Sequence, residues 1–149
     1  RAVADVKSAT GVPVIVNGDI VDAATARDAL IRSEADAVMI GRGIQGRPWI
    51  AASIDRALAG EGRDGAPDAD ARLAVVLDHF RDNLAFYGDR LGLRVFRKHL
   101  ARYIEEAPWP ESPDARRAAK SRLCQIDQPA EVERALIALW TGTALRQAA

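Results

Sequence analysis

Two short apolar runs, each followed directly by a glycine-containing turn, constrain the fold of this chain more than any other feature. Residues 13–16 read Pro-Val-Ile-Val, and residues 37–40 read Ala-Val-Met-Ile. Runs without polar alternation are typical of parallel strands that are buried on both faces. Their starts lie 24 positions apart (13 to 37), which leaves room for one helix between them. The pattern predicts a strand-helix-strand crossover whose two strands are parallel and end on the same side.

Helical segments surround these two strands. Residues 1–10 resemble the end of a helix, Asp22 can cap a helix over residues 23–32, and another helix begins near residues 45–49 and runs to residue 59. The following stretch, Gly-Glu-Gly-Arg-Asp-Gly-Ala-Pro at residues 60–67, is polar and has no periodicity. We therefore expect residues 1–60 to form an α/β portion, residues 61–70 a linker, and residues 71–149 a second domain.

The second domain reads as helical throughout. Its first helix has Asp68 or Asp70 as a cap and Gly88 as its end, and a second spans residues 93–105. Prolines open the other two helices, at Pro113 and Pro129. Four amphipathic helices with short connections predict an all-α four-helix bundle.

Composition narrows the function classes. The 149 residues are 48% hydrophobic and 28% charged, which is the balance of a globular protein and excludes a disordered chain. The 21 Lys and Arg residues offset 21 Asp and Glu residues, so net charge alone indicates no nucleic-acid partner. Cys124 is the single cysteine and no Cys/His cluster has metal-ligand spacing, which predicts no disulfide and no metal site. With no apolar run near the roughly 20 residues of a membrane helix and no export signal, we expect a cytoplasmic protein without membrane contact.

The turns after the two strands carry the candidate binding site. They read Asn-Gly-Asp at residues 17–19 and Gly-Arg-Gly at residues 41–43. Glycine lets backbone N–H groups approach an anion, and (β/α)8 barrels frequently bind phosphate with the loops after their last two strands. Arg42 would add a charge-assisted contact. The spacing alone fits ordinary turn chemistry equally well, and the role of Asp19 stays open.

Three segments together resemble one family. They are Pro-Val-Ile-Val-Asn-Gly-Asp-Ile at residues 13–20, Asp-Ala-Val-Met-Ile-Gly-Arg-Gly at residues 36–43, and Gly-Arg-Pro-Trp at residues 46–49. This combination resembles the end of the catalytic barrel in the tRNA-dihydrouridine synthase family. The resemblance implies an α/β fold in which residues 1–60 are about two βα units ending a (β/α)8 TIM barrel that binds FMN. It further implies contacts to the phosphate end of FMN from Asn17, Gly18, Asp19, Gly41 and Arg42.

One position departs from the family pattern. Before the second strand, where the family usually has a glycine ending the preceding helix, this chain has Glu34. A left-handed conformation costs a residue with a side chain roughly 1 kcal/mol. We therefore expect the helix to end differently at this turn.

A basic stripe runs along the second helix of the helical domain. At 100° per residue, one face of this helix carries Arg94, Lys98 and Arg102. The opposite face carries Phe96, Leu100 and Tyr103. Such a stripe can follow a phosphate backbone, although the spacing also fits an ordinary solvated helix face. The triplet Arg-Lys-His at residues 97–99, after Tyr87-Gly88, resembles the helical domain with which the family binds tRNA. The resemblance implies tRNA contacts from Arg94, Arg97, Lys98, His99 and Arg102, and a second group of cations could extend them, namely Arg116, Arg117, Lys120 and Arg122.

The family resemblance also implies a reaction. Reduced FMN, regenerated by NADPH, reduces specific uridines of tRNA to 5,6-dihydrouridine, and a cysteine on a barrel loop supplies the proton. Cys124 matches no catalytic motif, so we expect no catalytic residue in this chain; the proton donor and most of the barrel would lie upstream of Arg1. The isolated chain should then be inactive, and its strand edges should pair with the missing N-terminal barrel portion or with another copy.

Two other functions remain open. One is a fragment of another FMN-barrel dehydrogenase, of the dihydroorotate or dihydropyrimidine type, which would share the two-loop phosphate site but lack the basic helical bundle. The other is a non-catalytic RNA-binding module, which would bind tRNA without flavin.

Overall fold

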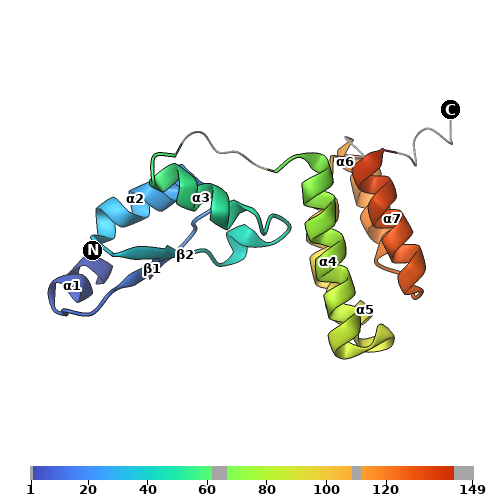
Figure 1. Cartoon of the computed structure of the whole chain (residues 1–149), viewed down its shortest axis with the longest axis horizontal. Helices are drawn as coiled ribbons and strands as arrows, with labels where there is room; N and C mark the ends of the chain where they lie inside the picture. Colours follow the sequence, from blue (N-terminus) through green and yellow to red (C-terminus); the bar gives the residue numbers. More distant parts are fainter. Residues whose placement is uncertain (1, 62–66, 109–111, 143–149) are drawn as a thin grey trace. The chain divides into compact units, whose positions relative to one another are not determined.

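The computed structural model describes residues 2–61, 67–108 and 112–142 of the chain. The chain divides into two compact units, Arg1–Ala66 and Pro67–Ala149 (Figure 1). Residues 62–66 of the expected linker lie outside the described residues, and the last two residues of that linker already belong to a helix, because α4 begins at Ala69.

The first unit contains the expected crossover. Its elements are α1 (Ala2–Ser8), β1 (Ile15–Asn17), α2 (Ala23–Ser33), β2 (Ala37–Met39), the 3₁₀ turn η1 (Arg42–Ile44) and α3 (Ile50–Leu58). β1 and β2 pair in parallel with Val16 opposite Val38, as the apolar runs predict. The Asp22 carboxylate accepts a 2.7 Å hydrogen bond from the amide of Thr25, whose hydroxyl accepts one from the amide of Asp22. This capping box starts α2 at the predicted position.

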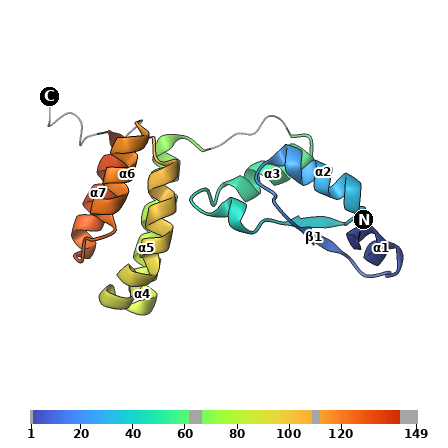
Figure 2. The same ribbon diagram turned by 180° about the vertical axis from the view of Figure 1, so that it is seen from behind.

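Helices α2 and α3 cover one face of the two-stranded sheet (Figures 1 and 2), over a core that includes Ile20, Ala26 and Ile54. On the other face the side chains of Ile15 and Met39 are 61% and 52% exposed. The prediction that both strands are buried on both faces is therefore wrong for the described part of the chain. Burial of the second face requires opposing strands, and the sheet described here has only two. An apolar hollow of about 650 Å³ lies beside β2 and α3.

The end of α2 also differs from expectation. Glu34 adopts the left-handed conformation, with φ of 55° and ψ of 20°, and its amide donates a 2.8 Å hydrogen bond to the carbonyl of Leu30. The helix thus ends as it would with the family's glycine. The left-handed conformation of Glu34 costs about 1–2 kcal/mol of local free energy. It is adopted because the chain must turn directly into β2.

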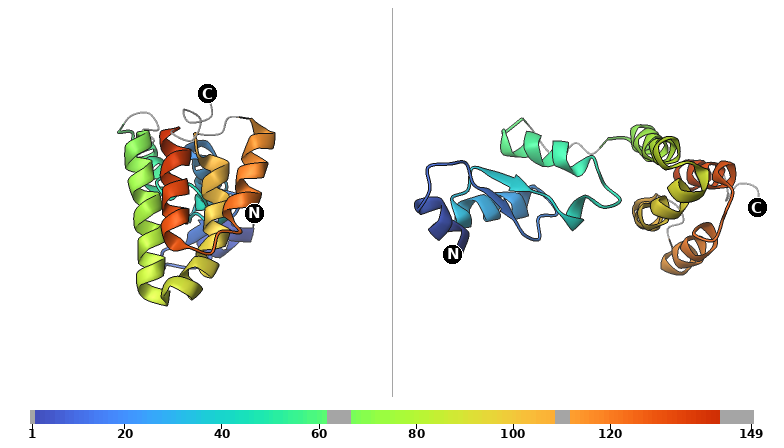
Figure 3. Two further views of the ribbon diagram at one scale, coloured as in Figure 1. Left: turned by 90° about the vertical axis from the view of Figure 1, so that its right-hand side faces the viewer. Right: turned by 90° about the horizontal axis from the view of Figure 1, so that it is seen from below.

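The second unit consists of α4 (Ala69–Tyr87), α5 (Asp89–Glu106), α6 (Pro113–Leu123) and α7 (Pro129–Thr141). Asp68 caps α4 by accepting a 2.8 Å hydrogen bond from the amide of Ala71. Prolines occupy the first turns of α6 and α7, where their missing N–H is not needed. Figure 3 shows the four helices lying alongside one another.

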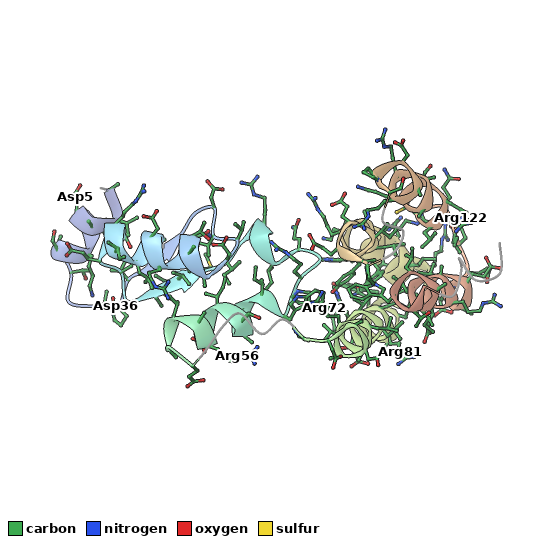
Figure 4. All side chains as sticks on the ribbon, turned by 90° about the horizontal axis from the view of Figure 1, so that it is seen from above. Asp5, Asp36, Arg56, Arg72, Arg81 and Arg122 are labelled. Atoms are coloured by element: carbon green, nitrogen blue, oxygen red, sulfur yellow. The ribbon has the colours of Figure 1, made fainter. Side chains whose placement is uncertain are left out.

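The core of this unit lies between α4, α5 and α7, which contact one another, while α6 packs on α5. Figure 4 shows their side chains filling the space between these helices. Gly92 of α5 lies so close to α4 that a Cβ there would sit 2.6 Å from the carbonyl oxygen of Asn83. Fully buried side chains come from all three central helices: Val76, Phe80, Phe96, Leu100 and Leu136.

Candidate functional site

The two glycine-containing turns leave the same edge of the sheet. Asn17 and Met39 are partners at the C-terminal ends of β1 and β2, so the chain after each strand emerges on the same side. A Cβ placed on Gly41 would lie 3.7 Å from Oδ1 of Asn17. The structure therefore brings together the two turns whose glycines were selected from the sequence.

Gly43 fixes the distance between these turns. A Cβ on this residue would lie 2.2 Å from the carbonyl oxygen of Ile20 and 3.2 Å from Cα of Val21. No side chain fits at that distance, so η1 can lie against the first turn only because residue 43 is glycine. Gly43 was not among the site residues predicted from the sequence, although it is the second glycine of the Gly-Arg-Gly turn.

The turns leave space and positive charge for an anion. Apart from Gly18 and its two chain neighbours, no heavy atom of the described residues lies within 4 Å of the position that a Cβ on Gly18 would occupy. The side chain of Arg42 is 89% exposed, and its Nη2 lies 3.7 Å from Oδ1 of Asp19, which is 98% exposed. An ion pair this exposed stabilises little, so Arg42 can exchange Asp19 for a phosphate. Open backbone beside an exchangeable guanidinium fits a phosphate group, while the charge of Asp19 opposes one.

Asp36 connects the surrounding elements. Its carboxylate accepts two hydrogen bonds from Lys7 of α1, at 2.8 and 2.7 Å, and one of 2.7 Å from the amide of Val14. The bond from Lys7 is the largest reason that the pKa of Asp36 is lowered. The aspartate that opens the second family-like segment thus joins α1 to the N-terminal starts of β1 and β2, at the edge of the sheet opposite the two turns, a role the sequence did not suggest.

The predicted basic stripe on α5 is exposed but not uniformly free. Arg94 and Lys98 point to solvent, and neither forms an ion pair with any residue in the described ranges. Arg102 lies 2.8 Å from the carboxylate of Glu105 on the same helix. The charge available to a polyanion is therefore concentrated at Arg94 and Lys98.

The other two predicted tRNA contacts lie in packed surroundings. The half-buried Arg97 donates to the carboxylate of Asp127, so it joins α5 to the connection before α7. His99 is half-buried beside His79, with the ring centroids 4.7 Å apart, and His79 Nδ1 lies 2.9 Å from the hydroxyl of Tyr103. Burial lowers the pKa of both histidines and raises the pKa of Tyr103 to about 12. The lowered pKa favours the neutral form of both histidines, which adds no charge to the stripe.

Glu105 binds two of the cations that could have extended the basic stripe onto α6. Lys120 donates to its carboxylate and Arg116 to its backbone carbonyl. The hydrogen bond from Lys120 is the main cause that lowers the pKa of Glu105. Arg117 is paired with Asp114 at 3.1 Å. Most of the second basic group thus faces acidic partners or the backbone.

Cys124 lies half-buried at the end of α6, and burial raises the pKa of its thiol. Among residues 2–61, 67–108 and 112–142, no cluster of His, Cys, Asp and Glu side chains could hold a metal ion. Within the same ranges no helix has the length and hydropathy needed to cross a bilayer.

Comparison with known proteins gives one consistent result. Residues 1–140 match the family model described as dihydrouridine synthase (Dus). A probable tRNA-dihydrouridine synthase of Rhodobacter capsulatus is 48% identical over 79% of this chain and 36% of its own length. A second protein of that name, from Rickettsia bellii, is 40% identical over 70% of the chain and 32% of its own length. The tRNA-dihydrouridine synthase B of Pseudomonas aeruginosa is 38% identical over 72% of the chain and 32% of its own length.

The chain thus spans about one third of the length of the curated relatives it matches. The family match covers both compact units, from the crossover and its paired turns to most of α7. On this evidence the chain belongs to the dihydrouridine synthase family.

Proposed function

We propose that this chain is the part of a tRNA-dihydrouridine synthase that holds the phosphate of FMN and contacts tRNA. The whole protein would reduce specific uridines of tRNA to 5,6-dihydrouridine, with NADPH as the reductant of the flavin. The observation that carries the proposal is the contact between the two turns at the strand ends, with Arg42 exposed beside them, in a member of this family.

The five residues selected from the sequence have separable roles in this proposal. Backbone N–H groups near Gly18 and Gly41, together with the Arg42 guanidinium, would bind the phosphate. Asn17 would use its side-chain amide, and Asp19 would face a hydroxyl group of the cofactor rather than the phosphate. When bound, reduced FMN supplies the hydride for the uracil ring. The described residues anchor the cofactor and carry none of the proton transfer.

The exposed apolar face of the sheet fits the same proposal. Ile15 and Met39 would be covered by the other strands of a TIM barrel, with the N-terminal portion as the missing partner. In the second unit, we propose that α4 to α7 act as a helical bundle that binds tRNA, with Arg94 and Lys98 as its main phosphate contacts. A tRNA substrate also favours a cytoplasmic protein.

The direct test uses the full-length protein. It should be yellow, contain FMN, and oxidise NADPH in the presence of unmodified tRNA, and mass spectrometry of that tRNA should show uridines that have gained two hydrogens. A colourless protein that binds tRNA would instead identify a non-catalytic RNA-binding module. A flavoprotein that reduces a free pyrimidine and leaves tRNA unchanged would identify the alternative dehydrogenase.

Alanine substitutions should distinguish the α5 cations that contact phosphate from the one that an acidic side chain compensates. In the full-length protein, the double change Arg94→Ala with Lys98→Ala should flatten the dependence of log affinity for tRNA on log salt by roughly two, because each lost phosphate contact removes about 0.9. Arg102→Ala should change this slope less, since Glu105 already compensates Arg102. Fluorescence anisotropy at several salt concentrations measures the slope, and an unchanged flavin content shows that folding is retained. Equal slopes for all three proteins would contradict this assignment.

A further inference from the structure

An exposed aromatic pair ends α4. The side chains of Phe86 and Tyr87 are 81% and 45% exposed, and their ring centroids lie 4.7 Å apart in an edge-to-face arrangement. Phe86 has the largest exposed fraction among the exposed large hydrophobic residues of the described chain. A single exposed apolar side chain needs no explanation, but two adjacent aromatic rings beside a groove do.

Tyr87 lines a groove of about 1070 Å³ in the second unit. One wall is the α4–α5 turn with Arg90 and Arg94, and the other is the connection between α6 and α7, which includes Asp127. Arg90 and Arg94 lie one helical turn apart on α5, and neither forms an ion pair within the part of the chain that the structure describes.

The groove is lined by three further charged side chains besides Arg90 and Arg94, namely Arg97, Asp127 and Asp89. Arg97 is bound to Asp127, so that cation and that acid compensate each other. Asp89, in the first turn of α5, also lines the groove and is the acid that opposes an anion there. Among the described residues, the groove therefore offers two guanidinium groups without an acidic partner and one aromatic ring, against one acid, Asp89, without a cationic partner.

This combination suits one class of ligand better than others. An apolar protein segment would bury Arg90 and Arg94 without partners, which is costly. A double-stranded RNA backbone would use the arginines but not the ring, because paired bases are stacked within the helix. An unpaired nucleotide uses both, since its base stacks on an aromatic side chain and its phosphate meets arginine.

We propose that this groove binds an unpaired nucleotide of the tRNA, with its base stacked on Tyr87, against which Phe86 packs, and its phosphate at Arg90 and Arg94. The inference rests on the proposed function, because it takes tRNA as the substrate. It adds two residues to the tRNA-binding surface that the basic stripe did not include: Tyr87 and Arg90. The groove would recognise a looped-out nucleotide, whereas the stripe follows a backbone of any sequence.

The test compares aromatic and charge variants of the full-length protein. Tyr87→Leu should weaken binding of tRNA and of a single-stranded oligouridylate by about 5- to 150-fold, the range for the loss of one stacked base. Phe86→Leu removes only the ring that packs against Tyr87 and should weaken binding less. Their salt slopes should match wild type, and Tyr87→Phe should retain the affinity. Arg90→Gln should lower the slope by about one. Val75→Ala, at a partly exposed apolar position of the same helix, is the matched control and should bind as wild type does.

The outcomes separate this proposal from the proposed function. If wild type binds tRNA and the leucine variants bind it equally well, the groove assignment is overturned and the function stands. If those variants keep their tRNA affinity but shift the sedimentation of the protein, the aromatic pair is a protein contact and the groove assignment is again wrong. If wild type itself binds no tRNA, both proposals fail.

Discussion

Gly92→Ala is expected to destabilise the helical unit by about 1–3 kcal/mol, the usual cost of forcing a methyl group into a packed site. Its Cβ would lie 2.6 Å from the carbonyl oxygen of Asn83 and 3.0 Å from Cα of Leu84, so α5 must move away from α4. The expected sign is opposite to helix propensity, which favours alanine over glycine by about 1 kcal/mol within a helix. Chemical denaturation followed by circular dichroism measures the change.

Gly11→Ala is the control for this experiment. A Cβ on Gly11 meets no heavy atom within 4 Å in the described part of the chain beyond its own chain neighbours, and the residue does not have positive φ. Its stability should therefore stay within about 0.5 kcal/mol of wild type, as for most surface changes. A Gly92→Ala protein as stable as wild type, or more stable, would show that the two helices separate without cost.

Gly43→Ala should remove most of the bound flavin from the full-length protein. The Cβ would lie 2.2 Å from the carbonyl oxygen of Ile20, so the turn carrying Arg42 must withdraw from the turn after β1. Because a tenfold loss of affinity corresponds to about 1.4 kcal/mol, a strain of 1–3 kcal/mol predicts roughly 5- to 150-fold weaker binding of FMN.

The measurement is the ratio of flavin absorbance to protein after gel filtration, followed by titration of the apoprotein with FMN. Gly11→Ala again serves as the control, because Gly11 precedes β1 and lies outside the two turns. A Gly43→Ala protein that keeps full flavin occupancy would show that contact between the turns is not needed to bind the cofactor.

The sequence predicted the features of this fold that depend on local patterns. The parallel crossover followed from two apolar runs and their spacing, and the helix starts followed from Asp22, Pro113 and Pro129. The tight backbone contacts at Gly43 and Gly92 could not be predicted this way. They depend on which distant backbone lies opposite, and a glycine in the sequence does not reveal its neighbour.

The charges of the candidate tRNA surface could likewise be predicted only in part from the sequence. The stripe on α5 follows from helical periodicity, so its exposed positions were predictable. The availability of each cation was not, because Arg97 is paired with Asp127, 30 positions away, and Lys120 with Glu105, 15 positions away. Such pairs form only when segments distant in the sequence pack together. Sequence spacing thus located the positive charges and could not say which of them are compensated.

Because Glu105 lies near the C-terminal end of α5, the positive charge of that helix is compensated at one end and not, among the described residues, at the other. Glu105 engages Arg102 and Lys120, whereas Arg90 and Arg94 lie toward the N-terminal end, where the helix dipole is also positive. A polyanion diffusing toward the protein would be drawn to this end before any contact forms. As ionic strength rises, the approaching polyanion should lose this preferred orientation. The association rate constant should then fall steeply.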